Sequence, residues 1–323
     1  MKKLIYVLFL LIIIIPSTYG EDIFIPQFLY DLFKNKIMVT KEGGETDFEE
    51  INFSFKNEND FISFSKYIKN LPLIKNKNLK MKEGILKLWK DKFTTASFSS
   101  GKVKFKNNEI YAEIVPQHSN IQISKDTLGI LPRKVIFLWN GETAQRLIYN
   151  RNGEKILDIY DKWYEISQFP QFIDFDIILE DSFLEGFRYS KLLKNEDVEI
   201  KKEKTGYLIT LKLVKESFLS IIHHQINTSI LALHSIEHFI KLENNEILLQ
   251  TRYYRGYSKS NINTWVPQVS FHIMRLYDIK TGGTKGFIGK VVFLKWNFHP
   301  WKEEFCIPME EGTIVRDHII NIK

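Results

Sequence analysis

The sequence has little cysteine, glycine or proline. Its single cysteine, Cys306, leaves no partner in the chain for a disulfide, so we expect it to pack as a small apolar residue in a strand. The 16 glycines and 9 prolines in 323 residues exclude a collagen-like chain and argue against long flexible linkers. With 44% hydrophobic residues, the composition is that of a globular protein with a full core.

Several common sequence motifs for catalysis are missing, as are those for nucleic-acid binding. The chain has no Gly-x-Ser-x-Gly elbow, and Lys280–Gly286 lacks the residue order of a phosphate-binding loop, so we expect a hairpin turn there. The carboxylates of Asp174–Glu185 are spaced too diffusely for a paired-carboxylate hydrolase and indicate a solvated loop. No nucleic-acid-binding motif accompanies the net charge of +6, so we expect no nucleic-acid partner. The charge reflects either a lysine-rich composition or an anionic partner.

A long apolar run occurs at the N-terminus, where Leu4 to Ile15 follow two lysines and precede Pro16. At ~1.5 Å per residue this run reaches about 18 Å, well short of a ~30 Å bilayer core. Residues 1–20 are therefore expected to be a cleaved signal peptide, which predicts an exported protein of the periplasm or cell envelope. An uncleaved anchor is the alternative. No later stretch is long and apolar enough to span a membrane.

From Lys102 onward, apolar residues alternate with polar ones, which is typical of antiparallel strands. Asn140-Gly141 is a strong hairpin signal, because both residues tolerate the positive φ of a type I′ turn. We expect a mainly β protein with some α, in which a curled antiparallel sheet of about ten strands wraps around a few short helices. The helices are expected at Phe28–Phe33, at Asn59–Asn70, and at Ile85–Lys92 with Ile85, Leu88 and Trp89 on one face.

The segment Thr264–Asp317 is expected to form the last strands of this sheet in chain order. A turn at Thr281–Gly283 is expected to join two strands, and the second should lie centrally because Val291–Phe298 is apolar on both faces. A short strand is expected at Glu304–Pro308, followed by a corner at Glu311-Gly312.

The sharpest candidate for chemistry is His234-Ser235-Ile236-Glu237-His238, which matches the H-x-x-E-H pattern of inverted zinc proteases. On a helix, His234 and His238 would share a face and could bind zinc, with Glu237 as the base. The segment instead runs into an alternating strand and a hairpin, and on a strand Glu237 points away from both histidines. We therefore expect strand histidines here, and no catalytic, cofactor-binding or metal-binding residues in the chain.

Several of these features resemble the outer-membrane lipoprotein-sorting carriers, the LolA/LolB-like group. The likeness covers the helix ending near Lys92, the Lys102–Val115 hairpin, Val135–Glu142, and the ending Phe305–Asp317 with its Glu-Gly-Thr-x-Val-x-Asp pattern. The resemblance implies a half-barrel at residues 79–323, after an extension of mixed α/β structure at 21–78. It also implies an apolar cavity that holds lipid or lipoprotein acyl chains. None of the family's ligand-contacting residues can be matched to a position here.

The leading hypothesis is a non-enzymatic exported protein that binds an acyl chain, a lipid or a lipoprotein in an apolar cavity. The alternatives are a structural or protein-binding envelope module with a filled core and, less favoured, a zinc hydrolase using residues 234–238. The ligand, the partner and the oligomeric state do not follow from the sequence.

The predicted signal peptide can be tested by sequencing the N-terminus of the mature protein after expression in an exporting host. We expect it to begin within a few residues of Glu21. Recovery of intact protein starting at Met1 in the membrane pellet would show that the apolar run is an anchor.

Overall fold

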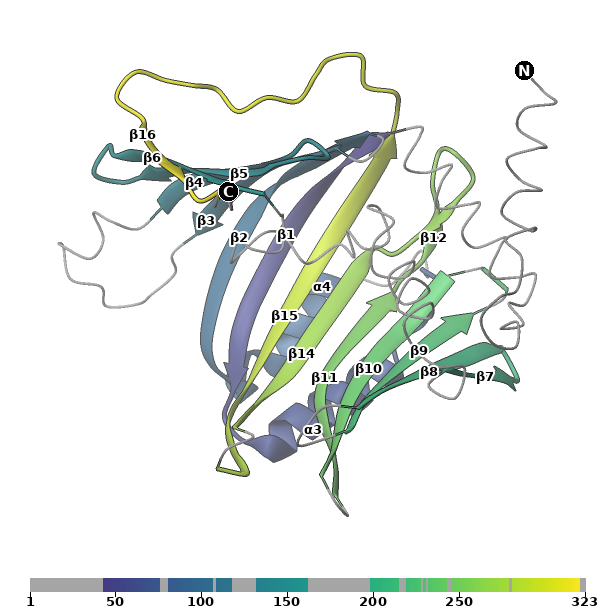
Figure 1. Ribbon diagram of the computed structural model, residues 1–323. Coiled ribbons are helices and arrows are strands. Elements are labelled where there is room, and N and C mark those ends of the chain that lie inside the picture. Colours follow the sequence, from purple (N-terminus) through teal and green to yellow (C-terminus); the bar gives the residue numbers. More distant parts are fainter. Residues whose placement is uncertain are drawn as a thin grey trace, which may run out of the picture.

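The computed structural model describes residues 43–75, 81–106, 109–117, 132–161, 198–214, 219–227, 229–230, 232–242, 245–278 and 281–319. In this part of the chain, fourteen strands form one open sheet and two more form a separate hairpin (Figure 1). The predicted class, mainly β with a curled antiparallel sheet and few helices, is confirmed, with more strands than the ten expected. The predicted signal peptide, the helix at Phe28–Phe33 and the acidic segment Asp174–Glu185 lie outside the described residues.

The sheet runs in the order β16-β6-β5-β4-β3-β2-β1-β15-β14-β11-β10-β9-β8-β7. The strands of its first half are β1 (Gly44–Phe55), β2 (Phe93–Lys106), β3 (Glu109–Gln117), β4 (Pro132–Trp139), β5 (Ala144–Asn150) and β6 (Lys155–Tyr160). The others are β7 (Val198–Glu203), β8 (Gly206–Val214), β9 (Leu219–Asn227), β10 (Ala232–Leu242), β11 (Asn245–Arg255), β14 (Val269–Asp278), β15 (Gly283–Phe298) and β16 (Ile314–Asp317). The separate hairpin consists of β12 (Ser258–Lys259) and β13 (Trp265–Val266).

Strands β1 and β15 lie side by side in the middle of the sheet, paired from Gly44↔Phe298 to Ser54↔Ile288. The predicted central position of Val291–Phe298 is therefore confirmed. Strand β1 comes from the region 21–78 that the sequence analysis set apart as an extension, yet it pairs with β2 on its other edge. The middle of the sheet thus depends on residues far apart in the chain.

Both faces of these central strands are apolar. On one face, which we call the helix face, Ile51, Phe53, Phe271 and Val291 are buried beneath helices. On the other, which we call the hairpin face, the buried side chains come from β1 to β5 and β15, and Val266 of the β12–β13 hairpin joins them. Alternation along the strands assigns neighbouring residues such as Val291 and Val292 to opposite faces.

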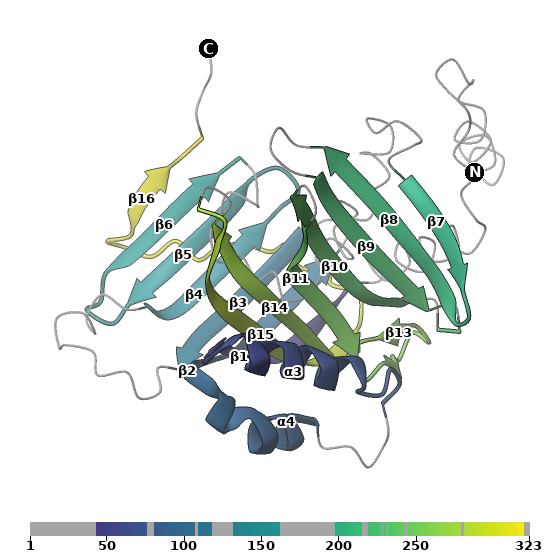
Figure 2. The ribbon, with the colours of Figure 1, turned by 90° about the horizontal axis from the view of Figure 1, so that it is seen from below.

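Two helices pack on the helix face, against the middle of the sheet (Figure 2). Helix α3 (Glu58–Lys69) begins after Asn57, whose side chain accepts a hydrogen bond from the Asp60 amide at 3.0 Å, as an N-cap does. Its buried residues Phe61, Phe64 and Ile68 have the predicted helical spacing and contact the sheet.

Helix α4 (Met81–Trp89) is followed by a 3₁₀ turn at Lys90–Lys92, so the predicted end near Lys92 is confirmed. The predicted face of this helix is partly wrong. Ile85 is buried and Trp89 packs on the core, but Leu88 is 61% exposed. Spacings of three and four residues place all three side chains on one side of the helix, but the part of that side that meets the core holds Ile85 and Trp89 and leaves Leu88 in solvent.

The hairpin between β4 and β5 forms where Asn140-Gly141 predicts it, but through a different turn. Gly141 has a φ of 91°, whereas Asn140 has no positive φ, so the turn is not type I′. The Asn140 side-chain oxygen instead accepts hydrogen bonds from the amides of Glu142 at 3.0 Å and Thr143 at 2.8 Å. An asparagine that closes a turn with its side chain does not need a left-handed backbone.

The C-terminal region departs furthest from the expectations. Residues 299–313 form no strand, so the strand predicted at Glu304–Pro308 is wrong, and Cys306 is exposed rather than packed in a strand. In this segment Ile307 is buried in a cluster with Ile136 and Leu147, and Phe305 packs against the same cluster. Strand β16 then pairs with β6 in parallel, an arrangement that alternation alone did not indicate.

Among the described residues, no helix combines the length and the hydropathy needed to cross a membrane.

Replacement of Leu294 by alanine tests the central position of β15. Leu294 is 5% exposed and lies in the core of the hairpin face. The cavity left by the substitution should lower the free energy of unfolding by about 2–5 kcal/mol. Chemical denaturation measures this change, and the exposed neighbour Lys295→Ala is the control, expected within about 0.5 kcal/mol of wild type. Equal loss in both variants would mean that burial of Leu294 does not stabilise the fold.

Candidate functional site

The H-x-x-E-H segment lies on strand β10 and not on a helix, as the alternation predicted. Glu237 pairs with Thr251 and His238 with Gln250 of β11, so their side chains leave opposite faces of the sheet. His234 falls where the register shifts between Leu233 and Ser235, at a β-bulge. The side chains of Glu237 and His238 therefore lie on opposite faces of the sheet. A zinc protease would need the two close together. In the described ranges no three His, Cys, Asp or Glu side chains are grouped to hold a metal.

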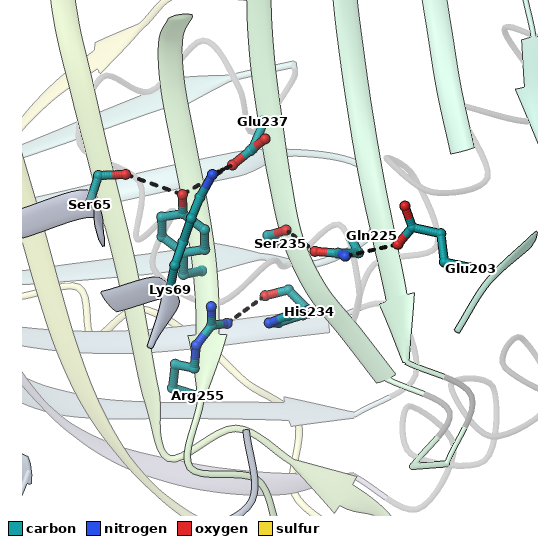
Figure 3. A network of polar contacts seen from close by, with 9 residues as sticks. Ser65, Lys69, Glu203, Gln225, His234, Ser235, Glu237 and Arg255 are labelled. Atoms are coloured by element: carbon teal, nitrogen blue, oxygen red, sulfur yellow. Dashed lines mark hydrogen bonds and ion pairs between the residues drawn. The ribbon is translucent and has the colours of Figure 1, made fainter. Parts of the chain in front are cut away.

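The same strand takes part in a polar cluster centred on Arg255, at the end of β11 (Figure 3). Arg255 is 1% exposed, which is unusual for a charged side chain. Its Nε donates to the Ile68 carbonyl of α3 at 3.1 Å. Its Nη1 donates to the carbonyls of His234 at 2.9 Å and Tyr254 at 2.8 Å. One guanidinium therefore joins α3, β10 and β11 through backbone oxygens.

Burial lowers the pKa of Arg255 to about 10, so the group stays charged near neutral pH. Three carbonyl oxygens and the ring of Tyr253, 5.1 Å from the guanidinium carbon, offset the lost hydration. The C-terminal end of a helix carries partial negative charge, and the Ile68 carbonyl lies at that end of α3. Burial and the charge of Arg255 also lower the pKa of His234 to about 4, so that imidazole is neutral.

Glu237 forms the second centre of the cluster. It accepts from the Tyr253 hydroxyl at 3.1 Å and pairs with Lys69 of α3 at 2.7 Å. Ser65 of α3 lies 3.3 Å from the same hydroxyl. Burial acts to lower the pKa of Lys69, but the hydrogen bond and charge of Glu237 outweigh it, so that pKa is raised. The motif residue that resembled a catalytic base thus holds a helix on the sheet.

The polar contacts continue along the helix face toward the β7 edge of the sheet. Ser235 is bonded to Gln225 of β9 at 3.3 Å, and Gln225 donates to Glu203 of β7 at 3.1 Å. Each of these groups has a partner, and the cluster contains no nucleophile paired with a general base. Its arrangement anchors the C-terminal half of α3.

Sequence reasoning missed Arg255. The available signal was its phase, because Tyr253 and Arg255 are two residues apart on one strand and share a face. A charged residue in phase with a buried aromatic one indicates a buried cation that needs partners. Its partners are backbone carbonyls, which leave no trace in a sequence.

The hairpin face offers an extended apolar surface instead of a polar site. Its buried residues span six neighbouring strands, from β5 to β15. They are Phe48, Val103, Phe105, Ile110, Ala112, Val135, Phe137, Ala144, Val292, Leu294 and Phe298. In the described part of the chain, the side chains that join this cluster from outside the sheet are Ile262 and Val266, both in the segment that carries the β12–β13 hairpin.

The β12–β13 hairpin is attached to β15 by a few polar contacts. The Asn261 side chain donates to the Phe298 carbonyl at 2.5 Å and accepts from the Phe298 amide at 3.1 Å. The Trp296 indole donates to the Pro267 carbonyl at 2.7 Å. Gly256 and Asn263 have positive φ values of 66° and 63°, so the chain bends sharply where it leaves the sheet and at the hairpin tip. The described part of the chain that covers the hairpin face from outside the sheet is therefore a small element with its own turns.

Comparisons with known proteins add little to this picture. No family model and no curated protein matches the sequence. One solved structure, a candidate outer membrane lipoprotein-sorting protein domain from Vibrio parahaemolyticus, is 9% identical, with a TM-score of 0.40 over 86% of this chain and 93% of that one. A lipovitellin structure titled for its lipid–protein interactions is 11% identical, with a TM-score of 0.17 over 81% of this chain and 26% of the other. The functional argument therefore rests on this chain's own residues.

Replacing Arg255 by methionine tests its role in anchoring α3. Methionine keeps much of the volume but leaves three buried carbonyl oxygens without their donor, so we expect a loss of about 3–5 kcal/mol in the free energy of unfolding. Hydrogen exchange should become faster at the C-terminal end of α3. The control is Lys66→Met, which changes an exposed lysine of the same helix and should cost about 0.5 kcal/mol or less. An Arg255→Met protein with wild-type melting and exchange would contradict the anchoring role.

Proposed function

We propose that this chain is a non-enzymatic, exported binding protein that takes up the apolar part of a lipid, or the acyl chains of a lipoprotein, on its hairpin face. The observation that supports the proposal is the extent of this face. It is lined by apolar side chains from six neighbouring strands, whereas the described cover consists of one short hairpin with two apolar side chains. An acyl chain is apolar, like the side chains of that hairpin, and can bury the same residues of the hairpin face.

The physical basis of the proposal is exchange of one apolar cover for another. Side chains of the hairpin face are buried in the structure, Val103 and Phe105 fully. A ligand must therefore displace apolar surface. Moving the tip of the β12–β13 hairpin breaks the hydrogen bonds of Asn261 with Phe298 in addition to apolar contacts, while Tyr257 at the base of the hairpin stays bonded to Leu73 and Leu233. Burial of about 400 Å² of acyl surface at ~25 cal/mol per Å² contributes roughly 10 kcal/mol, from which association and displacement costs subtract. Micromolar binding is then expected.

The helix face is a poorer candidate for the same role. Aromatic rings from both sides fill it, with Phe53 stacked on Phe93 at 4.0 Å and Phe64 near Trp89 at 4.9 Å. Arg255 and Glu237 then fasten α3 over these rings. A ligand entering there would have to break a buried guanidinium cluster, which is costly. The difference in attachment favours the hairpin face.

Displacement of a neutral apolar fluorophore, N-phenyl-1-naphthylamine, tests the proposal. Long-chain fatty acids should displace it with micromolar affinity and short-chain acids should not, because each methylene contributes ~0.8 kcal/mol. Ile262→Ala weakens the internal cover and should tighten probe binding several-fold, while the exposed apolar residue Met309→Ala should leave it unchanged.

The structural alternative gives the opposite results. If the hairpin face is a permanently filled core, the probe does not bind, displacement shows no dependence on chain length, and Ile262→Ala only lowers stability.

A further inference from the structure

The hairpin face is not apolar along its whole length. Two residues before Val292 on β15, the face carries Lys290, which pairs with Asn52 of β1 and with His272 of β14. His272 in turn pairs with Arg252 of β11. Paired residues on neighbouring strands point to the same face, so these four side chains form one row across four strands. We call Lys290, His272 and Arg252 the basic row.

On β15 the basic row borders the apolar part of the hairpin face, with Glu50 of β1 and Ser270 of β14 on either side of Val292. A step of two residues along a strand is about 7 Å, so Val292 lies that far from Lys290, with Leu294 and Trp296 following in the same direction. From Val292 to Phe298 the face extends for roughly 20 Å along β15. The surface is thus amphipathic from one end to the other, with cations at one end and a long apolar track beyond them.

Lys290 and Arg252 are the cationic residues of the row. Lys290 lies 3.1 Å from Glu50, and its side chain is 28% exposed. Glu50 also accepts a hydrogen bond from Asn52 at 2.5 Å and pairs with Val292, so this carboxylate lies on β1, on the same face and one step beyond the row. Burial, together with the charges of Arg252 and Lys290, lowers the pKa of His272 to about 3, which keeps its imidazole neutral. Arg252 stands two strands away from Lys290, about 10 Å at ordinary strand spacing.

We infer that the basic row binds the anionic head group, a carboxylate or a phosphate, of the amphiphile whose apolar chain lies on the hairpin face. This inference rests on the proposed function. Lys290 and Arg252 are cations two strands apart on one half-buried face, and an anion held between them is attracted to both. A guanidinium has five N–H donors, so Arg252 can hold a ligand oxygen in addition to an acceptor from the chain.

The arrangement also sets the direction in which the ligand lies. The head group takes the basic row, and the chain runs along Val292 and Leu294 toward Trp296. An uncharged head group loses the interaction with the cations, and a cationic one is repelled. The row therefore selects among amphiphiles that the apolar face alone would bind equally.

Isothermal titration of the full-length protein with four amphiphiles of one chain length tests this inference. They are tetradecanoate, tetradecyl phosphate, tetradecanol and tetradecyltrimethylammonium, each below its micellar concentration. We expect both anions to bind roughly tenfold or more tightly than the alcohol, and the cation most weakly. Inorganic phosphate alone should neither bind measurably nor compete.

Substitutions in the basic row then test whether these residues cause the preference for anionic amphiphiles. Arg252→Gln should reduce the ratio of anion to alcohol affinity several-fold, and Arg252→Lys, which keeps the charge, should retain most of it. Lys241→Gln removes the same charge from an exposed position on β10 and should leave the ratio unchanged. If Arg252→Gln does not fold, the paired substitution of Lys290 and Glu50 by glutamine removes the other cation without stranding a buried carboxylate.

Failure of the inference differs from failure of the proposed function. Equal binding of tetradecanol and tetradecanoate overturns the head-group site but leaves apolar binding intact. A preference that persists in Arg252→Gln, or in the paired variant, also overturns it, as does binding of inorganic phosphate as tight as that of the amphiphiles. If none of the four binds, the proposed function itself fails.

Discussion

The central strands of this sheet are apolar on both faces, and the rest of the structure depends on that constraint. Ile51 and Val291 face one way, and Phe48 and Val292 the other. Both apolar faces of β1 and β15 must be removed from water, and other elements of the chain have to pack on them to do so. Two helices cover one face and the β12–β13 hairpin contributes to covering the other, so the position of these elements follows from the alternation of β1 and β15.

The two covers differ in how firmly they are attached. On the helix face, interlocking aromatic rings and the buried guanidinium of Arg255 hold α3, with Lys69 and Glu237 as a second link. On the hairpin face, a short β-ribbon rests on apolar contacts and on the hydrogen bonds of Asn261 and Trp296, and Tyr257 holds its base through hydrogen bonds to Leu73 and Leu233. The described covers on opposite sides of one sheet thus differ in their attachment, and the proposed ligand binding rests on this difference.

Local patterns in the sequence predicted the strands, the hairpin at Asn140 and the burial of α3, because each depends on neighbours within a few residues. Long-range features were not predictable in this way. The parallel pairing of β16 with β6 and the exposure of Leu88 depend on which surfaces meet in three dimensions. A bulge near Leu249 shifts the register of β11, so Ile247 and Thr251 lie on opposite faces although simple alternation places them together. Arg255 has backbone partners, which no residue pattern records.

The central claim is that the ligand's chain lies on the hairpin face. Photo-crosslinking with a long-chain fatty acid that carries a diazirine near its terminal carbon, followed by residue-level mass spectrometry, tests this most directly. The account predicts adducts on hairpin-face residues of β15 and β2, such as Leu294, Trp296 and Val103. Adducts confined to helix-face residues such as Phe271 or Val291, or to the helices themselves, would contradict it.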